Sequence, residues 1–130
     1  MSLGLSLVFW SLVLFEAKHF ICDFVLQTPY QYRNKGIYGH PGGFVHAGFH
    51  GLGSIPAILM VSDSAWLVAV IVAAEFLFHY HVDWLKEQIN KARALSFDDM
   101  LYWVVFGADQ LLHQMSYVII LAVLARAANL

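Results

Sequence analysis

Four long apolar segments constrain this chain more than any other feature of its sequence. Each is close to the roughly 20 residues that an α-helix needs to cross a bilayer. Backbone N–H and C=O groups in lipid must be satisfied within the segment, which favours helices over open strands. The sequence therefore predicts an all-α fold, a four-transmembrane-helix bundle forming a single integral membrane domain over residues 1–130. The predicted helices cover about residues 3–26, 44–61, 65–85 and 97–125.

Composition supports a lipid environment. Hydrophobic residues make up 60% of the chain and charged residues 12%, whereas soluble domains carry about 25% charged residues. The formal net charge of −2 gives no electrostatic support to a nucleic-acid partner. We therefore expect the protein to have the lipid bilayer as its partner and to bind no nucleic acid.

Local signals mark where the predicted helices begin and end. Pro29 disfavours helix at Thr28, and the turn-rich GHPGG at 39–43 precedes the second segment. The apolar N-terminus lacks a basic region and a small-residue cleavage site. We expect it to be the first membrane helix, retained in the mature protein, and not a signal peptide.

Lysine and arginine placement predicts the orientation. The first loop carries Arg33 and Lys35, and the third carries Lys86, Lys91 and Arg93. The loop between the second and third segments has neither residue type. Positive residues are enriched in cytoplasmic loops. We therefore expect a multi-pass protein with the first and third loops in the cytoplasm and both termini outside it.

Each predicted helix carries two polar residues spaced four apart, and residues at i and i+4 share a helix face. The pairs of the first and third helices lie near the C-terminal ends, and those of the second and fourth lie toward the N-terminal ends. All four pairs then fall in the cytoplasmic half of the bilayer and can converge on one buried site. The pairs are His19 and Asp23, His46 and His50, His79 and Asp83, and Asp109 and His113.

The polar pattern also repeats along the chain. HFICDF at 19–24 and HYHVDW at 79–84 share a histidine, an aspartate and the aromatic residues beside them. The pairs at 46–50 and 109–113 match at a similar offset. This repetition favours two pseudo-repeated helical hairpins, related by an axis along the membrane normal.

Ionisable groups inside a membrane are costly and by default indicate function. Histidine and aspartate together are ligands for divalent transition metals, with zinc first and iron or manganese as alternatives. One tetrahedral ion needs fewer ligands than the eight paired residues offer. Either two ions are held, or some carboxylates orient ligating histidines from behind.

A metal at this site would lower the pKa of a bound water to about 7 and produce a hydroxide nucleophile. Glu16 and Glu75 lie about one turn from His19 and His79 on the same stripes. We interpret these two glutamates as the candidate catalytic proton acceptors.

Several other polar residues have plainer interpretations. His81 projects some 200° away from His79 around the helix, so we expect it outside the site. Lys18 and Lys86 are expected to extend toward the headgroups. Three amides are expected only to hydrogen-bond between helices: Gln27, Gln110 and Gln114.

These motifs carry a family resemblance. H-x3-D-F-x-L-Q at 19–27, the H-x3-H after the glycine turn, H-x3-D-x2-K at 79–86 and D-Q-x2-H at 109–113 resemble the DUF3307 family of uncharacterised bacterial and phage integral membrane proteins. The resemblance covers most of the chain. It implies a small multi-helix protein of the bacterial inner (cytoplasmic) membrane with these polar positions as its signature, and it supplies no substrate. A looser similarity exists to small membrane-bound metal-dependent hydrolases.

Three functions stay open from the sequence. The leading hypothesis is a membrane-embedded metal-dependent hydrolase that acts at the cytoplasmic leaflet on an ester, amide or phosphoester, including a lipid-linked substrate. The alternative is a non-enzymatic component: a proton or ion conduit, or an accessory subunit of a larger membrane complex or homo-oligomer. Haem ligation by opposed histidines is the third, and the many carboxylates disfavour it. A polar network that only holds the helices together is the plainest interpretation.

Overall fold

The computed structural model describes residues 2–130, and no strand forms within that range. The all-α prediction is confirmed. One element, η1, is a short π-helix that continues directly from α1. The elements are α1 (Leu3–Phe20), η1 (Ile21–Val25), α2 (Pro29–Asn34), α3 (Pro41–Gly53), α4 (Ile55–Leu59), α5 (Ala65–Ala92) and α6 (Met100–Ala127).

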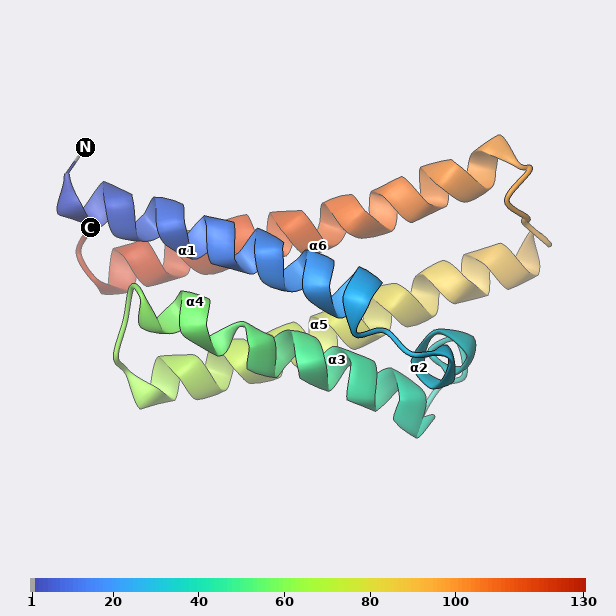
Figure 1. The fold of residues 1–130 in the computed structure, drawn as a ribbon, viewed down its shortest axis with the longest axis horizontal. Helices are drawn as coiled ribbons and strands as arrows, with labels where there is room; N and C mark the ends of the chain where they lie inside the picture. The colour runs from blue at the N-terminus through green and yellow to red at the C-terminus, as the bar shows by residue number, and fades with distance from the viewer. Residues whose placement is uncertain (1) are drawn as a thin grey trace.

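The helices form one elongated antiparallel bundle. Figure 1 shows α1 and α5 running in one direction, while α3, α4 and α6 return, so that both termini lie at the same end. α1 packs against α4 and α6, and α5 packs against α3 and α6. The loop after α5 and the short helix α2 lie at the opposite end from the termini.

Three helices are long and apolar enough to cross a membrane: Leu3–Val25, Ala65–Ala92 and Met100–Ala127. Their outward-facing side chains are apolar. Val104, Leu111 and Ile119 on α6 are 58%, 57% and 62% exposed, which suits a lipid solvent and not water. The prediction of apolar helices of membrane length is confirmed for these three segments.

The predicted continuous helix over residues 44–61 is wrong. The chain divides there into α3 and α4 at Ser54, because Pro56 has no N–H and its ring obstructs the preceding turn. Side-chain hydroxyls satisfy carbonyls near the break: Ser54 Oγ donates to His50 O at 3.1 Å and Ser11 Oγ donates to Ala57 O at 2.7 Å. Neither piece reaches membrane length, so the count of four membrane-length helices is not confirmed, although the two pieces together form the fourth leg of the bundle (Figure 1).

The end of the first membrane-length helix is a π-helix and not the regular α-helix that its sequence predicts. Leu26 N–H donates to Ile21 O at 2.8 Å, a bond that spans five residues. Such widened turns are rare in proteins overall. Those that do occur lie frequently at functional sites. This one contains Asp23.

Close approach between α3 and α5 depends on glycine. A Cβ at Gly51 would lie 3.1 Å from the carbonyl oxygen of Val72, and one at Gly43 would lie 3.0 Å from the Tyr80 ring. Small residues let membrane helices approach closely. This contact brings the histidines of α3 next to those of α5.

A capped loop precedes α6. The carboxylate of Asp99 accepts hydrogen bonds from the Ser96 N–H at 2.7 Å and from the Ser96 hydroxyl at 3.0 Å. These bonds favour the charged carboxylate and lower the pKa of Asp99. They fix the turn from which α6 starts at Met100.

Candidate metal centre

The structure brings all eight paired residues into one buried cluster, which we call the polar cluster. The side chains of His46, His50, His79 and His113 are at most 1% exposed. Contacts of 3.8 Å or less connect the eight members without a gap. The members are His19, Asp23, His46, His50, His79, Asp83, Asp109 and His113.

Four donor atoms in the polar cluster meet at one point. Asp23 Oδ1 lies 3.0 Å from His50 Nε2 and 3.1 Å from His46 Nε2, and His46 Nε2 lies 3.2 Å from His79 Nε2. Adjacent ligands of a tetrahedral ion with bonds of about 2.0–2.1 Å are roughly 3.3 Å apart. Three of the donor pairs have nearly this spacing, and all four donors lie within 4.8 Å of one another, so small side-chain shifts would let the set hold a zinc-type ion.

A second group of three donors lies beside the first, formed by His79, Asp83 and His113. Asp83 contacts His79 at 3.4 Å and His113 at 3.8 Å. Because His79 belongs to both groups, its one ring would have to serve both if two ions were held. The first group offers more donors at shorter separations.

Stacking holds the imidazole rings in place. The rings of His50 and His79 stack with centroids 3.6 Å apart, and those of His79 and His113 with centroids 4.0 Å apart. Interplanar angles of 23° and 21° make the three rings nearly parallel. The nitrogens therefore keep fixed directions, as preorganised ligands require.

Hydrogen bonding inside the polar cluster is incomplete. Nδ1 of His46, His50 and His79 and Nε2 of His113 are buried and have no hydrogen-bond partner within the described residues. Buried polar groups in a self-sufficient structural network are normally satisfied. The unpartnered nitrogens weigh against a purely structural network, although the three Nδ1 atoms lie on the opposite side of each ring from Nε2 and would not be satisfied by an ion bound there.

His19 and Asp109 lie at the edge of the cluster and belong to neither donor group. His19 Nδ1 lies 2.9 Å from Tyr117 OH, and His19 Nε2 lies 2.9 Å from Gln110 Oε1. Gln110 also donates to Asp23 Oδ2 at 3.1 Å. Both residues thus stand where they orient neighbours, and their role as ligands stays a prediction.

Buried lysines neutralise the carboxylates. Lys35 Nζ lies 3.2 Å from Asp83 Oδ2, and Lys86 Nζ lies 3.2 Å from Asp109 Oδ2. Lys18 pairs with Glu75. The expectation that Lys18 and Lys86 extend to the headgroups is wrong: each is only 8% exposed, because a buried carboxylate needs a partner.

Sequence reasoning missed these cations as parts of the site. Lys35 was placed in a loop, yet that loop folds back onto α5 and buries it. Lys86 follows Asp83 by three residues, an i,i+3 spacing on one helix face. That spacing indicates that Lys86 can pair with Asp83, whereas no local sequence pattern indicates that Lys35 reaches the site.

The two predicted proton acceptors stand apart from the donor groups. Glu75 is buried and pairs with Lys18, whose Nζ also donates to Tyr117 OH at 3.0 Å. Glu16 is half-buried and forms no ion pair with any other described residue. Their catalytic roles stay predictions.

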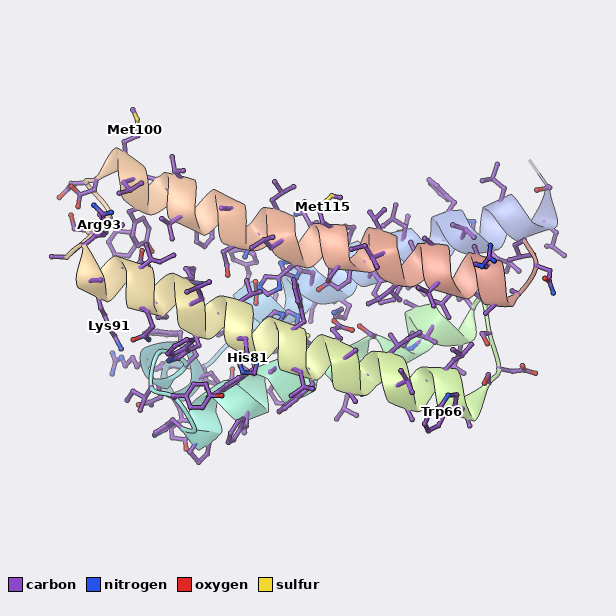
Figure 2. The ribbon with its side chains drawn as sticks, turned by 180° about the vertical axis from the view of Figure 1, so that it is seen from behind. Trp66, His81, Lys91, Arg93, Met100 and Met115 are labelled. Carbon is purple, nitrogen blue, oxygen red and sulfur yellow. The ribbon has the colours of Figure 1, made fainter. Side chains whose placement is uncertain are left out.

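Other predicted positions divide between the site and the surface. Gln27 Nε2 lies 3.3 Å from His46 Nε2, so Gln27 contacts the cluster directly. His81 is exposed on α5 (Figure 2), where it contacts Tyr38. The expectation that His81 lies outside the site is confirmed.

A polar cavity of about 190 Å³ adjoins the cluster. Asp23 lines it together with Gln110, Lys35 and Lys86. Asp23 thus faces the histidines on one side and this cavity on the other. The cavity gives small molecules a route to the donor atoms.

Fold and site together define an all-helical bundle with three membrane-length helices and a buried histidine–aspartate centre. The chain belongs to the family described as "Protein of unknown function (DUF3307)", which matches residues 11–130, nearly the whole chain. No curated protein and no solved structure matches it. The arguments about function therefore rest on the geometry of the site.

Proposed function

We propose that this protein is a membrane-embedded metal-binding protein that acts as a metal-dependent hydrolase at the cytoplasmic leaflet. The observation that carries the proposal is the meeting of three histidine Nε2 atoms with the Asp23 carboxylate at separations suited to a tetrahedral ion.

His46, His50 and His79 would hold the ion, which leaves the position beside Asp23 for the water that a catalytic zinc requires. Zinc suits this set best, and iron or manganese are the alternatives. Asp83 Oδ2 lies 3.1 Å from His46 Nε2 and 3.4 Å from His79 Nε2, so it approaches the ligating nitrogens themselves and would serve as a further donor. When bound, the ion would supply a water whose pKa is about 7 as the nucleophile.

The surrounding residues suit acid–base work in such a reaction. Hydrolysis adds the hydroxyl of one water to an acyl or phosphoryl centre and gives the proton to the leaving group. Asp23 borders both the cluster and the polar cavity, so it is placed to accept and return that proton. Glu75 connects to the cluster through Lys18, Tyr117 and His19, which makes it a better candidate than Glu16 for a second proton acceptor.

The same arrangement suggests a position in the membrane. Helix α2, which contains Arg33, lies at the end of the bundle opposite the termini (Figure 1), and so do Lys91 and Arg93 (Figure 2). This placement favours that end for the cytoplasm of a bacterial inner membrane. The polar cluster would then lie in the cytoplasmic half of the bilayer, with both termini outside the cytoplasm. The broken leg α3–α4 would complete the bundle as its fourth crossing.

Metal analysis of the purified protein tests the proposal. We expect about one zinc per chain, lost in His46→Ala because an ion that loses one of its three histidine ligands binds far more weakly. The matched control is His81→Ala, which removes an exposed imidazole outside the cluster and should keep the metal. A parent protein that holds no stoichiometric metal would end the proposal.

One observation favours a second candidate, a proton conduit. Hydrogen bonds and an ion pair connect the cluster through His19, Tyr117 and Lys18 to Glu75, and such chains of titratable groups serve as proton relays in membranes. A conduit would move protons across liposomes and lose that flux in Asp23→Asn or Asp109→Asn. An accessory subunit would instead co-purify with a fixed partner and tolerate both changes.

A further inference from the structure

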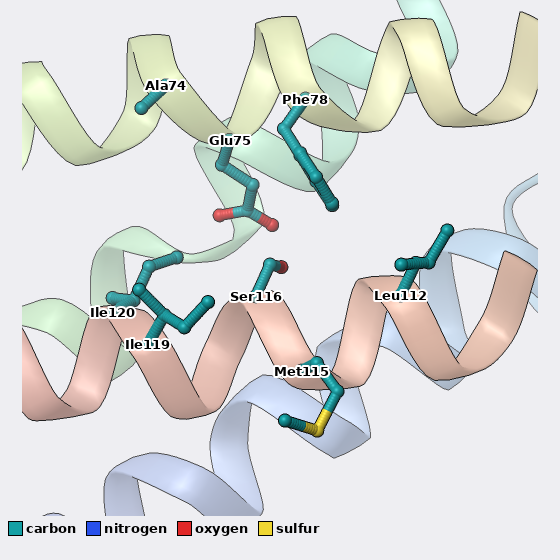
Figure 3. Close-up of a pocket in the computed structure, with 8 residues that line it drawn as sticks. All are labelled: Ala74, Glu75, Phe78, Leu112, Met115, Ser116, Ile119 and Ile120. Carbon is teal, nitrogen blue, oxygen red and sulfur yellow. The ribbon is translucent and has the colours of Figure 1, made fainter.

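A groove runs along the outer face of α5 and α6. Its larger part is a cavity of about 340 Å³ lined mostly by apolar side chains, including Phe78, Leu112 and Ile119 (Figure 3). Glu75 and Ser116 are its polar lining residues. A second cavity of about 110 Å³ continues it toward the loop end, and Leu112 lines both. At its far end this second cavity reaches Lys86 and Asp109.

The groove ends at a lysine that also borders the polar cavity. Lys86 lines both the second cavity and the polar cavity of about 190 Å³, which also contains Lys35, Gln110 and Asp23. The path thus changes from apolar side chains to ammonium and amide groups along its length. A ligand that fills it must be apolar at one end and polar at the other.

The dimensions suit a hydrocarbon chain within one leaflet. From Ile119 to Val105, α6 rises roughly 21 Å at 1.5 Å per residue. One leaflet contributes about 15 Å of a bilayer core of about 30 Å. The groove also opens to the surroundings, since Leu112 and Met115 are each 48% exposed.

The polar end offers donors for an oxygen anion. An ammonium carries three N–H donors, and Lys35 uses one of them on Asp83. Lys86 donates to Asp109 at 3.2 Å. Phosphate oxygens accept such charge-assisted bonds strongly.

The cations at the polar cavity are already paired with carboxylates before a ligand enters, Lys35 with Asp83, and Lys86 with Asp83, Asp109 and Glu87. Asp23 and Glu87 line the cavity as carboxylates, and Lys35 and Lys86 line it as cations. A divalent cation in the neighbouring donor group would add the positive charge that favours an anion. The ligand inference therefore depends on the metal centre.

We propose that the ligand is a phosphate-bearing lipid, with its hydrocarbon chain in the α5–α6 groove and its phosphate held by Lys86 and Lys35. This assignment names the substrate class of the proposed hydrolase and rests on that proposed function. In the reaction the hydroxyl of one water joins the phosphorus, the bond from phosphorus to the lipid alcohol oxygen breaks, and that alcohol takes the proton.

Photo-crosslinking of the full chain in phosphatidylcholine nanodiscs tests this inference. The probe is phosphatidic acid with a diazirine in its acyl chain, and zinc content is measured in the same samples. We expect saturable labelling at Leu112 and Met115, with unlabelled phosphatidic acid competing and inorganic phosphate not competing. Equal competition by inorganic phosphate would overturn the inference, because the acyl chain of the lipid would then contribute nothing to binding.

Two pairs of variants separate the groove from ordinary lipid contact. Ala74→Phe fills the groove with an aromatic ring and displaces the hydrocarbon chain. Labelling should therefore weaken about tenfold or more. The control is Ala73→Phe, which changes an exposed residue next to Ala74 that does not line the groove. This variant should be labelled as strongly as the parent protein. Equal labelling of the two variants would overturn the inference.

The second pair tests the headgroup. Lys86→Gln should remove the preference for phosphatidic acid over phosphatidylcholine, a loss of about tenfold for one charge-assisted bond, whereas Lys86→Arg should keep it. A preference that survives in folded Lys86→Gln protein would overturn the role of this lysine and with it the inference.

The zinc measurement separates this inference from the proposed function. Zinc-loaded protein without saturable labelling overturns the lipid assignment and leaves the metal centre standing. Labelling of a protein that holds no zinc overturns the assignment as substrate, because the metal proposal has then failed.

Discussion

The two halves of the bundle interior differ sharply in chemistry although the same helices build both. Near the termini, Phe15, Ile58 and Leu124 are completely buried and pack as an apolar core. Toward the loop end, His50 and His113 are just as buried and are surrounded by carboxylates and ammonium groups. The outer surface stays apolar along both halves.

On α5 the change occurs within about two turns. Ile71 belongs to the apolar core, whereas His79 belongs to the polar cluster. Packing alone holds the first region together, and in lipid such packing is the main driving force between helices. The second region must neutralise every charge it buries. The comparison teaches that apolar packing and buried ionisable groups are segregated along one set of helices. The ionisable groups, which are costly to bury, are concentrated in the half that contains the proposed metal centre.

The largest expected loss of stability lies in the polar half. Asp83→Ala would leave Lys35 and Lys86 without the carboxylate they share, and removing one partner of a buried pair typically costs about 3–5 kcal/mol. We expect a loss at the upper end of that range, measured by unfolding in mixed detergent micelles. Asp63→Ala changes an exposed loop carboxylate and should have little effect; similar losses for both variants would contradict the segregation.

Phe15→Ala tests the apolar half and should be the next most damaging change. The Phe15 ring stacks on Tyr117 with centroids 5.1 Å apart, and a buried Phe→Ala change costs about 3–5 kcal/mol in proteins. We expect a value near 3 kcal/mol, with the zinc content of the folded protein unchanged. Loss of the metal in folded Phe15→Ala protein would show that the halves are coupled.

The pair at the junction of the halves should show strong non-additivity. Lys18→Met alone strands the Glu75 carboxylate and should cost about 3 kcal/mol, whereas Lys18→Met with Glu75→Gln should recover most of that loss. A double-mutant cycle on unfolding measures the difference. Additive losses would mean that the Lys18–Glu75 pair contributes no mutual stabilisation.

The smallest expected effect lies at the break between α3 and α4. Ser11→Ala removes the hydroxyl that donates to Ala57 O at 2.7 Å, and interhelical hydrogen bonds in membranes average about 0.6 kcal/mol. We expect a loss of about that size, by the same unfolding measurement. A loss several times larger would indicate that the break depends on this bond.

The sequence predicts the parts of this molecule that depend on local periodicity. The apolar segments predict the helices, and the i,i+4 spacing of pairs such as His79 and Asp83 places both on one inward face. Similar depth of the four pairs then follows from alternating helix direction, and the structure brings those residues together.

Local periodicity does not predict features that depend on contacts between residues far apart in the sequence. Lys35 meets Asp83 only because α2 and its loop fold back against α5, a relation that no local pattern encodes. The π-turn around Asp23 also follows from packing and not from a residue preference visible in the sequence. Pro56, in contrast, carried a clear signal for the break after α3, and the strength of the surrounding apolar pattern obscured it.

Anomalous diffraction at the zinc absorption edge tests the central claim most directly. The account predicts one strong peak per chain beside the Asp23 carboxylate, at bonding distances of about 2.0–2.1 Å from Nε2 of His46, His50 and His79. A zinc-supplemented crystal with no peak at that point, or with its peak at surface residues only, would contradict the metal centre.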